Sequence, residues 1–316
     1  MKMTASLDRK HPDGYRRVYY QRKGLCMSRY ENLVRRYVRS LDPLPVSAPA
    51  GILTRKEKID TVLFDIYGTL VISEAGDIAV AEEASMRNEA EIDDLLKRYG
   101  IMRRAGHVSR AFYEEISATK EKMRCNGVDY PEVIVERIWH TVLRIHNEDI
   151  LRRFAIEYEL IVNAVAPMPH AGELLAFLRD NQVYSGIISN AQFYTPCLFP
   201  VLFGGDLTRL GFSPDLCIFS YRWGRCKPSP VLFNGAVTAL AEKGIKPANT
   251  LYVGNDMLKD IMPAAQVGFQ TALFAGDARS LRLREDDESC AALQPDYVVS
   301  DLSQIHDLIR DGRMHV

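Results

Sequence analysis

Several short segments place acidic, hydroxyl or basic side chains directly after or near apolar runs. These side chains are Asp65, Ser189, Asn190, Lys227, Asn255, Asp256 and Asp260. A carboxylate can attack an electrophilic centre and form a covalent intermediate that water then hydrolyses. A nearby ammonium group can neutralise the charge that develops during the attack. The residue types therefore favour a hydrolytic site, provided that the fold brings them together.

The stretch FDIYGTLV, residues 64–71, carries the first candidate, Asp65. Gly68 and Thr69 follow it closely, an arrangement typical of a nucleophile loop after a buried strand. Tyr67 stands two residues after Asp65, where many enzymes with such a loop carry a second Asp. A phenol with a reference pKa near 10 can donate a proton but is a poor base near neutral pH. Three interpretations stay open: a phosphate-transferring enzyme with an unusual acid, a dehalogenase, or a site that has lost its chemistry.

The elements that would position these residues follow from the hydrophobic pattern. Short apolar runs predict strands at 61–64, 183–189, 216–220, 250–254, 270–274 and 296–300. Amphipathic spacing predicts helices at 171–180, 230–243, 258–267 and 302–310. This alternation predicts an α/β fold with a Rossmann-like parallel sheet and helices on both faces. Because ligands bind beyond the carboxyl ends of parallel strands, we expect the candidate residues to meet at one edge.

Residues 74–165 are helical in character and predict an inserted all-helical domain between the first strand and the rest. The core domain is then expected from 59–73 and 166–316. Residues 1–58 are expected to form a basic extension and linker outside this core, since they hold 14 Lys and Arg against 5 Asp and Glu. Within the extension, the apolar spacing of 30–41 predicts a helix. We favour a helix docked on the body over one that meets a partner or an anionic surface.

The composition is that of an ordinary globular protein, with 316 residues, 47% hydrophobic, and 26% charged residues. A net charge of -1 gives no general attraction to nucleic acid or membranes, and neither is expected as a partner. The six cysteines lack CxxC spacing, which favours thiols in a reducing compartment. No signal-like segment or membrane-length apolar run is present, so a cytoplasmic location is predicted. The sequence does not indicate an oligomeric state.

Four motifs in order, FDIYGTL, IISN, CKPSP and VGNDMLKD, resemble those of the haloacid dehalogenase superfamily. The helical segment between the first two resembles the helical C1-type cap of that family. The resemblance covers residues 59 to about 310. It implies a hydrolase in which Asp65 is the nucleophile, Thr69 and Ser189 supply hydroxyls, and Lys227 neutralises charge. Substrate contacts are implied for Ser189, Asn190 and Lys227.

The resemblance also implies Mg²⁺, which prefers oxygen ligands. The implied ligands are Asp65, the backbone carbonyl of Tyr67, Asp256, Asn255 and Asp260. Asn255 stands where phosphatases of the family often have their first metal-binding Asp. With Lys227 as the only fixed countercharge, the close carboxylates would favour binding of a cation.

Two departures point in opposite directions. Dehalogenases of the superfamily carry Tyr at the position of Tyr67 and need no metal. Their fourth motif has a single Asp, however, and the Tyr expected six residues after the Lys is Phe233 here. We therefore predict a Mg²⁺-dependent phosphatase that acts on a small, anionic, phosphorylated metabolite through an aspartyl-phosphate intermediate. A metal-independent 2-haloacid dehalogenase is the first alternative, and a weakly active or inert ligand- or partner-binding protein is the second.

Overall fold

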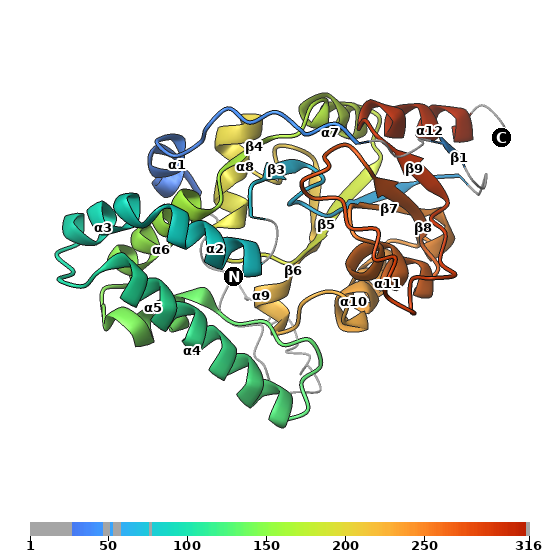
Figure 1. Ribbon diagram of the computed structural model, residues 1–316. Coiled ribbons are helices and arrows are strands. Elements are labelled where there is room, and N and C mark those ends of the chain that lie inside the picture. Colours follow the sequence, from blue (N-terminus) through green and yellow to red (C-terminus); the bar gives the residue numbers. More distant parts are fainter. Residues whose placement is uncertain (1–26, 47–50, 53–57, 76–77, 314–316) are drawn as a thin grey trace, which may run out of the picture.

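A seven-stranded sheet forms the centre of the computed structural model (Figure 1). The structure describes residues 27–46, 51–52, 58–75 and 78–313. The strand order is β1-β9-β8-β7-β2-β5-β6, with β1 Gly51–Ile52, β2 Thr61–Phe64, β5 Tyr184–Ser189, β6 Phe212–Phe219, β7 Thr250–Gly254, β8 Gln270–Phe274 and β9 Tyr297–Val299. The pairings from β9 through to β6 are parallel. The predicted α/β fold is confirmed, and all six predicted strands are present.

Helices cover both faces of this sheet, as the alternation of side chains along β2 requires. Val62 and Phe64 belong to one buried cluster, whereas Leu63 belongs to another on the opposite face. The helices that contribute to the first cluster include α7 Ala171–Asp180, α8 Thr195–Phe203 and α12 Ser303–Arg313; those of the second include α10 Pro230–Glu242 and α11 Met262–Gln266. All four residues of β2 are buried, so the run TVLF is apolar or uncharged throughout.

A helical insertion lies to one side of the sheet (Figure 1). Its helices are α2 Ile78–Arg87, α3 Glu89–Arg98, α4 Ala105–Cys125, α5 Val135–Leu143 and α6 Glu148–Val162. Trp139 centres its core and stacks on Phe112, with 4.0 Å between ring centroids. The insertion begins and ends at a two-stranded antiparallel sheet, β3 Val71–Ser73 with β4 Val165–Pro167. This small sheet was not predicted from the sequence.

The amino-terminal segment contributes to the body in two places. Helix α1 (Met27–Arg35) packs against α6 and α8, and Tyr30 and Val34 are 1% and 0% exposed. The prediction of a docked helix is therefore confirmed, but the helix ends at Arg35 and not at residue 41. Strand β1 pairs with β9 at the edge of the sheet. The expectation that residues 1–58 lie wholly outside the core is wrong here, because an open sheet edge offers unpaired backbone groups even to a strand of two residues.

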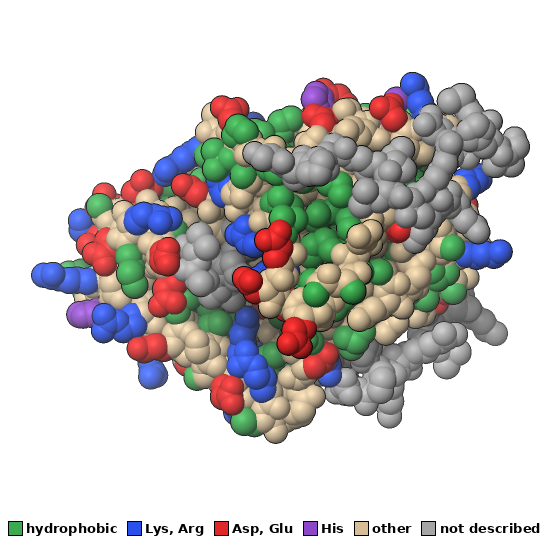
Figure 2. Space-filling view, turned by 45° about the vertical axis from the view of Figure 1, so that its right-hand side comes forward, with side chains coloured by type: hydrophobic (Ala, Val, Ile, Leu, Met, Phe, Trp, Pro, Cys, Tyr) green, Lys and Arg blue, Asp and Glu red, His purple; other side chains and the backbone are tan. Residues whose placement is uncertain are grey.

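The surface of the helical insertion carries charges of both signs. Figure 2 shows acidic and basic side chains interspersed over the helical insertion on the left of that face. Among the described helices, none is both long enough and apolar enough to cross a membrane.

The predicted helix at 258–267 takes a different form. A π-helical turn, Met257–Ile261, precedes the short helix α11. Asp256 caps this turn, since its Oδ1 accepts hydrogen bonds from the backbone nitrogens of Leu258 (2.9 Å) and Lys259 (3.1 Å). Asp260 then folds back over Gly254, where an added Cβ would lie 2.5 Å from the Asp260 carboxyl carbon. A glycine at the end of β7 is therefore what lets Asp260 reach the site.

Candidate active site

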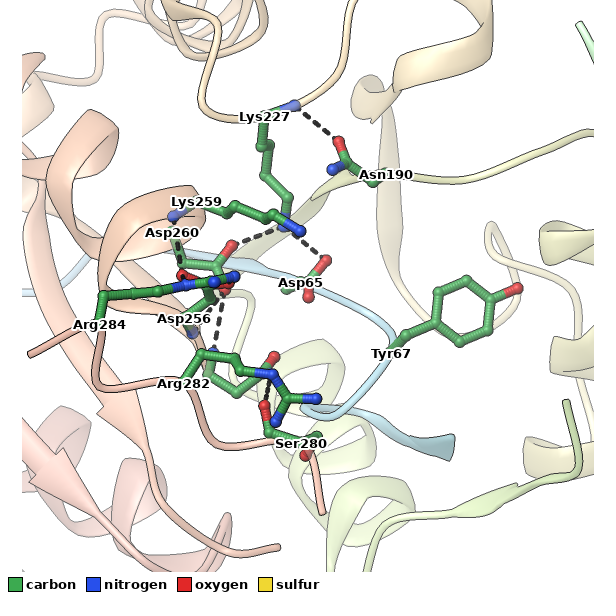
Figure 3. Close-up of a pocket in the computed structure, with 11 residues that line it drawn as sticks. Asp65, Tyr67, Asn190, Lys227, Asp256, Lys259, Asp260, Ser280, Arg282 and Arg284 are labelled. Atoms are coloured by element: carbon green, nitrogen blue, oxygen red, sulfur yellow. Dashed lines mark hydrogen bonds and ion pairs between the residues drawn. The ribbon is translucent and has the colours of Figure 1, made fainter. Parts of the chain in front are cut away.

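Asp65 lies at the carboxyl end of β2, the strand between β5 and β7. Its backbone nitrogen continues the sheet by donating to the carbonyl of Val253 at 2.9 Å. The loop then turns sharply at Gly68, which has a φ of 86° and would place a Cβ only 2.6 Å from Ser280. This turn leaves the Asp65 side chain, 7% exposed as a residue, at the wall of a pocket beyond the sheet (Figure 3).

Lys227 joins two carboxylates in this pocket (Figure 3). Its Nζ lies 2.7 Å from Asp65 Oδ1 and 2.6 Å from Asp260 Oδ1. The lysine is 3% exposed, and its backbone nitrogen is held by Asn190 Oδ1 at 2.7 Å. Burial lowers the pKa of Lys227, but the carboxylates of Asp260 and Asp65 outweigh burial and raise that pKa above its ordinary value. Lys227 therefore stays an ammonium ion, as the predicted neutralising role requires.

Asp260 is bound by protein donors on both oxygens. Its Oδ2 accepts hydrogen bonds from the backbone nitrogens of Asn255 (3.1 Å) and Asp256 (3.0 Å). Its Oδ1 lies 2.9 Å from the Tyr252 hydroxyl in addition to Lys227. Burial raises the pKa of Asp260 to about 6, with Lys227 acting in the opposite direction. These contacts make Asp260 a residue that positions Lys227 and the loop after β7.

Asp256 also has both oxygens engaged. Beyond the two backbone donors of the π-helical turn, Arg284 binds it in a bidentate manner. Arg284 Nε lies 3.1 Å from Oδ1, and Nη2 lies 2.6 Å from Oδ2. The predicted metal ligand is thus paired with a guanidinium group in this arrangement.

Thr69 and Asn255 support the loops behind the pocket. The Thr69 hydroxyl donates to Asn255 Oδ1 at 3.2 Å, and Asn255 Nδ2 donates to the carbonyl of Ser280 at 2.7 Å. Thr69 is fully buried, whereas Asn255 lines the pocket. Thr69 therefore orders the first motif from behind, at a distance from the reacting groups.

The second motif divides its two residues between the interior and the pocket. Ser189 is fully buried, and its hydroxyl donates to the carbonyl of Asn190 at a long 3.4 Å. Asn190 lines the pocket and binds the backbone of Lys227. Of the substrate contacts expected here, Asn190 and Lys227 line the pocket.

Tyr67 lines the pocket but directs its hydroxyl away from Asp65 (Figure 3). The phenol oxygen lies 2.9 Å from Thr195 Oγ1, at the start of α8. Burial raises the pKa of Tyr67 far above that of an ordinary phenol, and the charge of Glu159 adds to this shift. The hydroxyl therefore keeps its proton and bonds to α8.

Four further polar residues line the pocket that the sequence analysis did not identify: Lys259, Ser280, Arg282 and Arg284. Arg282 is placed by the backbone, since its nitrogen donates to the carbonyl of Asn255 (2.9 Å) and its carbonyl accepts from Met257 (2.9 Å). The available signal was the run RSLRLR at 279–284, in a part of the chain that is otherwise acidic. The expectation that Lys227 is the only fixed countercharge is wrong, because four cations face three carboxylates here.

The fit of a metal ion can be tested on these contacts. Carboxylate and amide oxygens of the kind that Mg²⁺ takes are present at Asp65, Asn255 and Asp256. Among the residues that the structure describes, however, no three His, Cys, Asp or Glu side chains are arranged to hold a metal. Each oxygen of Asp256 and of Asp260 instead accepts from at least one protein donor. The donor types suit Mg²⁺, but their present arrangement does not form its site.

Two known phosphatases are similar to this chain in sequence. A protein of Methanocaldococcus jannaschii, glyceraldehyde 3-phosphate phosphatase, is 25% identical over 233 residues, which cover 72% of this chain and 93% of that protein. Ribulose-1,5-bisphosphate 5-phosphatase of Halopiger xanaduensis is 28% identical over 144 residues, covering 45% of this chain and 56% of that protein. This chain thus spans about half the length of the second relative.

Solved structures and a family model complete the comparison. A HAD phosphatase from Thermococcus onnurineus aligns with a TM-score of 0.49 at 20% identity, over 79% of this chain and 98% of that one. The L-2-haloacid dehalogenase from Xanthobacter autotrophicus gives 0.48 at 19% identity, over 80% and 98%. The model of the haloacid dehalogenase-like hydrolase family matches residues 59–268, about two thirds of the chain. The resemblance found in the four motifs is confirmed, and the chain belongs to the haloacid dehalogenase-like hydrolases.

Proposed function

We propose that this protein hydrolyses the phosphate ester of a small metabolite through an aspartyl-phosphate at Asp65. The observation that carries the proposal is the buried Lys227, held between Asp65 and Asp260 at the carboxyl edge of the sheet. A carboxylate nucleophile beside a fixed ammonium suits attack on an anionic phosphoryl group. The two phosphatases named above support the same class of substrate.

The reaction would proceed in two displacements. Lys227 binds Oδ1 of Asp65, so the second carboxylate oxygen can attack phosphorus. A bond forms between that oxygen and phosphorus, and the bond from phosphorus to the ester oxygen breaks, so the ester oxygen leaves with the electron pair as an alkoxide. Water then attacks the phosphorus of the aspartyl-phosphate and loses a proton to solvent, while the bond from phosphorus to the Asp65 oxygen breaks, which releases phosphate and restores the Asp65 carboxylate. In both displacements Lys227 would offset the negative charge of the phosphoryl oxygens.

The departing oxygen must also gain a proton. Tyr67 directs its hydroxyl to Thr195, which argues against a role as the acid that protonates the leaving group. Esters with good leaving groups need little protonation, so aryl phosphates should react faster than alkyl phosphates.

We propose that the helical insertion is the cap that selects the substrate. We also propose that the protein is located in the cytoplasm.

We propose Mg²⁺ as the cofactor, as the family resemblance implies. Asp65, the carbonyl of Tyr67, Asn255 and Asp256 would supply its oxygen ligands. When bound, Mg²⁺ would add positive charge next to the transferring phosphoryl group. Binding at Asp256 requires that Arg284 release it first, because both oxygens are paired with that guanidinium.

One specific observation favours the alternative, a haloacid dehalogenase that needs no metal. Lys227, Lys259, Arg282 and Arg284 line the same pocket as the three carboxylates, so no further cation is required to balance their charge. The inert ligand-binding alternative has less support, because Asp65 and Lys227 form a buried ion pair at the edge of the sheet where a nucleophile and its countercharge would be needed.

A substrate screen separates these functions. Wild type and Asp65→Asn would be assayed on an aryl phosphate, an alkyl phosphate and a 2-haloacid, each with Mg²⁺ and with EDTA. We expect hydrolysis of the aryl phosphate that depends on Mg²⁺ and is abolished in Asp65→Asn, because the amide is not a nucleophile. Haloacid turnover that persists in EDTA would instead establish the dehalogenase, and inactivity on every substrate would favour the binding protein.

A further inference from the structure

The loop after β8 carries Arg284 and is fixed to the body at several points. Asp277, whose side chain is buried, accepts a hydrogen bond from the backbone of Leu44 at 3.0 Å, and the backbone of Ala278 donates to the carbonyl of Leu44 at 3.0 Å. The strand-like bridge between Asp256 and Arg282 holds the far end. Arg284 itself has a φ of 56°, which few residues other than glycine adopt. The backbone thus directs Arg284 toward the site.

The contact between Arg284 and Asp256 is specific in geometry. Two nitrogens of the guanidinium meet two oxygens of the carboxylate, as described above, and the Asp256 side chain is only 8% exposed. Bidentate pairs of this kind are among the stronger hydrogen-bonded contacts in proteins. The oxygens that Arg284 binds are the same ones that the metal would need.

We propose that Arg284 and a divalent cation are alternative occupants of Asp256, so that Arg284 sets the metal affinity of the site. The inference rests on the proposed Mg²⁺ role. A cation bound at Asp256 would displace the guanidinium and would also be repelled by its charge at short range. Arg284 therefore weakens metal binding and keeps Asp256 paired when the metal is absent.

Arg284→Gln tests this directly, and Arg282→Gln is its matched control. Both substitutions remove one positive charge from the same loop. The Arg284 guanidinium binds the Asp256 carboxylate, whereas the Arg282 guanidinium donates to the backbone carbonyls of Arg279 and Leu281. The dissociation constant of Mn²⁺ would be measured by electron paramagnetic resonance and that of Mg²⁺ by calorimetry, both without substrate. We expect Arg284→Gln to tighten binding by at least about tenfold more than Arg282→Gln, the equivalent of one charge-assisted hydrogen bond.

Further variants keep the test decisive. Arg284→Lys keeps the charge but loses the bidentate contact, so metal binding should tighten by less than in Arg284→Gln. This variant replaces Arg284→Gln if that protein does not fold. Asp256→Asn in the Arg284→Gln background should abolish the gain. Metal binding that is equal in the Arg284 and Arg282 variants would overturn this inference alone. If neither wild type nor any variant binds either ion, both this inference and the proposed role of Mg²⁺ are wrong. Hydrolysis of an aryl phosphate in EDTA would still show whether Asp65 acts as the nucleophile.

Discussion

The pocket has two walls that are built in different ways. One, here called the strand-end wall, consists of Asp65, Lys227 and Asp260, which are 7%, 3% and 1% exposed. The other, the loop wall, consists of Arg282 and Arg284 on the loop after β8, and both are only half-buried. The strand-end wall is anchored by parallel strands, whereas the loop wall is anchored by Leu44 and by one backbone bridge.

This difference separates two kinds of contribution. The charges in the strand-end wall are shielded from water, so each one needs its partners as countercharges. Removal of any one residue leaves the others buried and unpaired, which lowers the stability of the folded protein. The charges in the loop wall keep partial contact with solvent. Each therefore contributes less to stability, and its substitution should cost the folded protein less. We infer that the strand-end wall fixes the chemistry, while the loop wall adjusts affinity for metal and substrate.

The largest expected effect comes from Lys227→Met. Removal of the ammonium leaves Asp65 and Asp260 buried and facing each other without their countercharge. We expect a loss of about 3–5 kcal/mol in the free energy of unfolding, measured by denaturant titration. The kcat/KM for an aryl phosphate should fall by about 10²–10³-fold or more.

Lys243→Met is the control for that substitution. Its ammonium lies 3.5 Å from Asp215, and the side chain of that Asp is 66% exposed. Partly exposed contacts of this kind, including that of the ammonium with the Tyr184 ring at 5.6 Å, contribute about 1 kcal/mol, so both stability and activity should change little. If the two lysine variants lost similar stability, the distinction between the walls would not hold.

A smaller effect is expected from Asp277→Ala, which releases the loop wall. The buried carboxylate accepts hydrogen bonds from the backbone of Leu44 and of Arg279, each at 3.0 Å. Leaving those donors unpaired should cost about 1–3 kcal/mol. Because Arg282 and Arg284 would then be less firmly placed, KM should rise while kcat changes little.

Asp287→Ala provides the matched control for the loop. Asp287, on the same loop, is half-buried, and its carboxylate accepts hydrogen bonds from the backbone and hydroxyl of Ser289. Its charge interacts only weakly with Arg284, so KM should change far less than in Asp277→Ala. A fall in kcat in Asp277→Ala as large as that of Lys227→Met would show that the loop wall takes part in the chemistry.

The two walls also differ in how far the sequence predicted them. Asp65, Lys227 and Asp260 lie beyond or near the ends of strands that the apolar runs predicted, and the topology of a parallel sheet brings these strand ends to one edge. Asp260 also needs the π-helical turn and Gly254, which the sequence did not reveal. Arg284 lies in a loop without regular secondary structure, so no hydrophobic periodicity indicates which way its side chain points. Its position depends on contacts with Leu44, which is more than 200 residues away in the chain.

Other misses have local physical causes. Helix α8 has the sequence TPCLFPVLF, which is apolar on every side and contains Pro200, so neither amphipathic spacing nor helix propensity reveals it. Strand β1 has only two residues, and β3 and β4 have three each. Strands this short are defined by their partners rather than by their own composition.

The smallest expected effect concerns Tyr67→Phe, which removes one hydroxyl between the strand-end wall and α8. The lost hydrogen bond to Thr195 should cost about 1 kcal/mol in unfolding free energy. Because the hydroxyl is turned from Asp65, kcat/KM for aryl and alkyl phosphates should both stay within about threefold, far below the 10²–10⁴-fold typical of general acid–base catalysis. A double-mutant cycle with Thr195→Val isolates the bond, since Thr195 also accepts from the backbone of Gln192 at 3.2 Å. A selective loss of alkyl phosphate hydrolysis in Tyr67→Phe would contradict this account, because it would mean that the phenol turns toward the leaving group and acts as its acid.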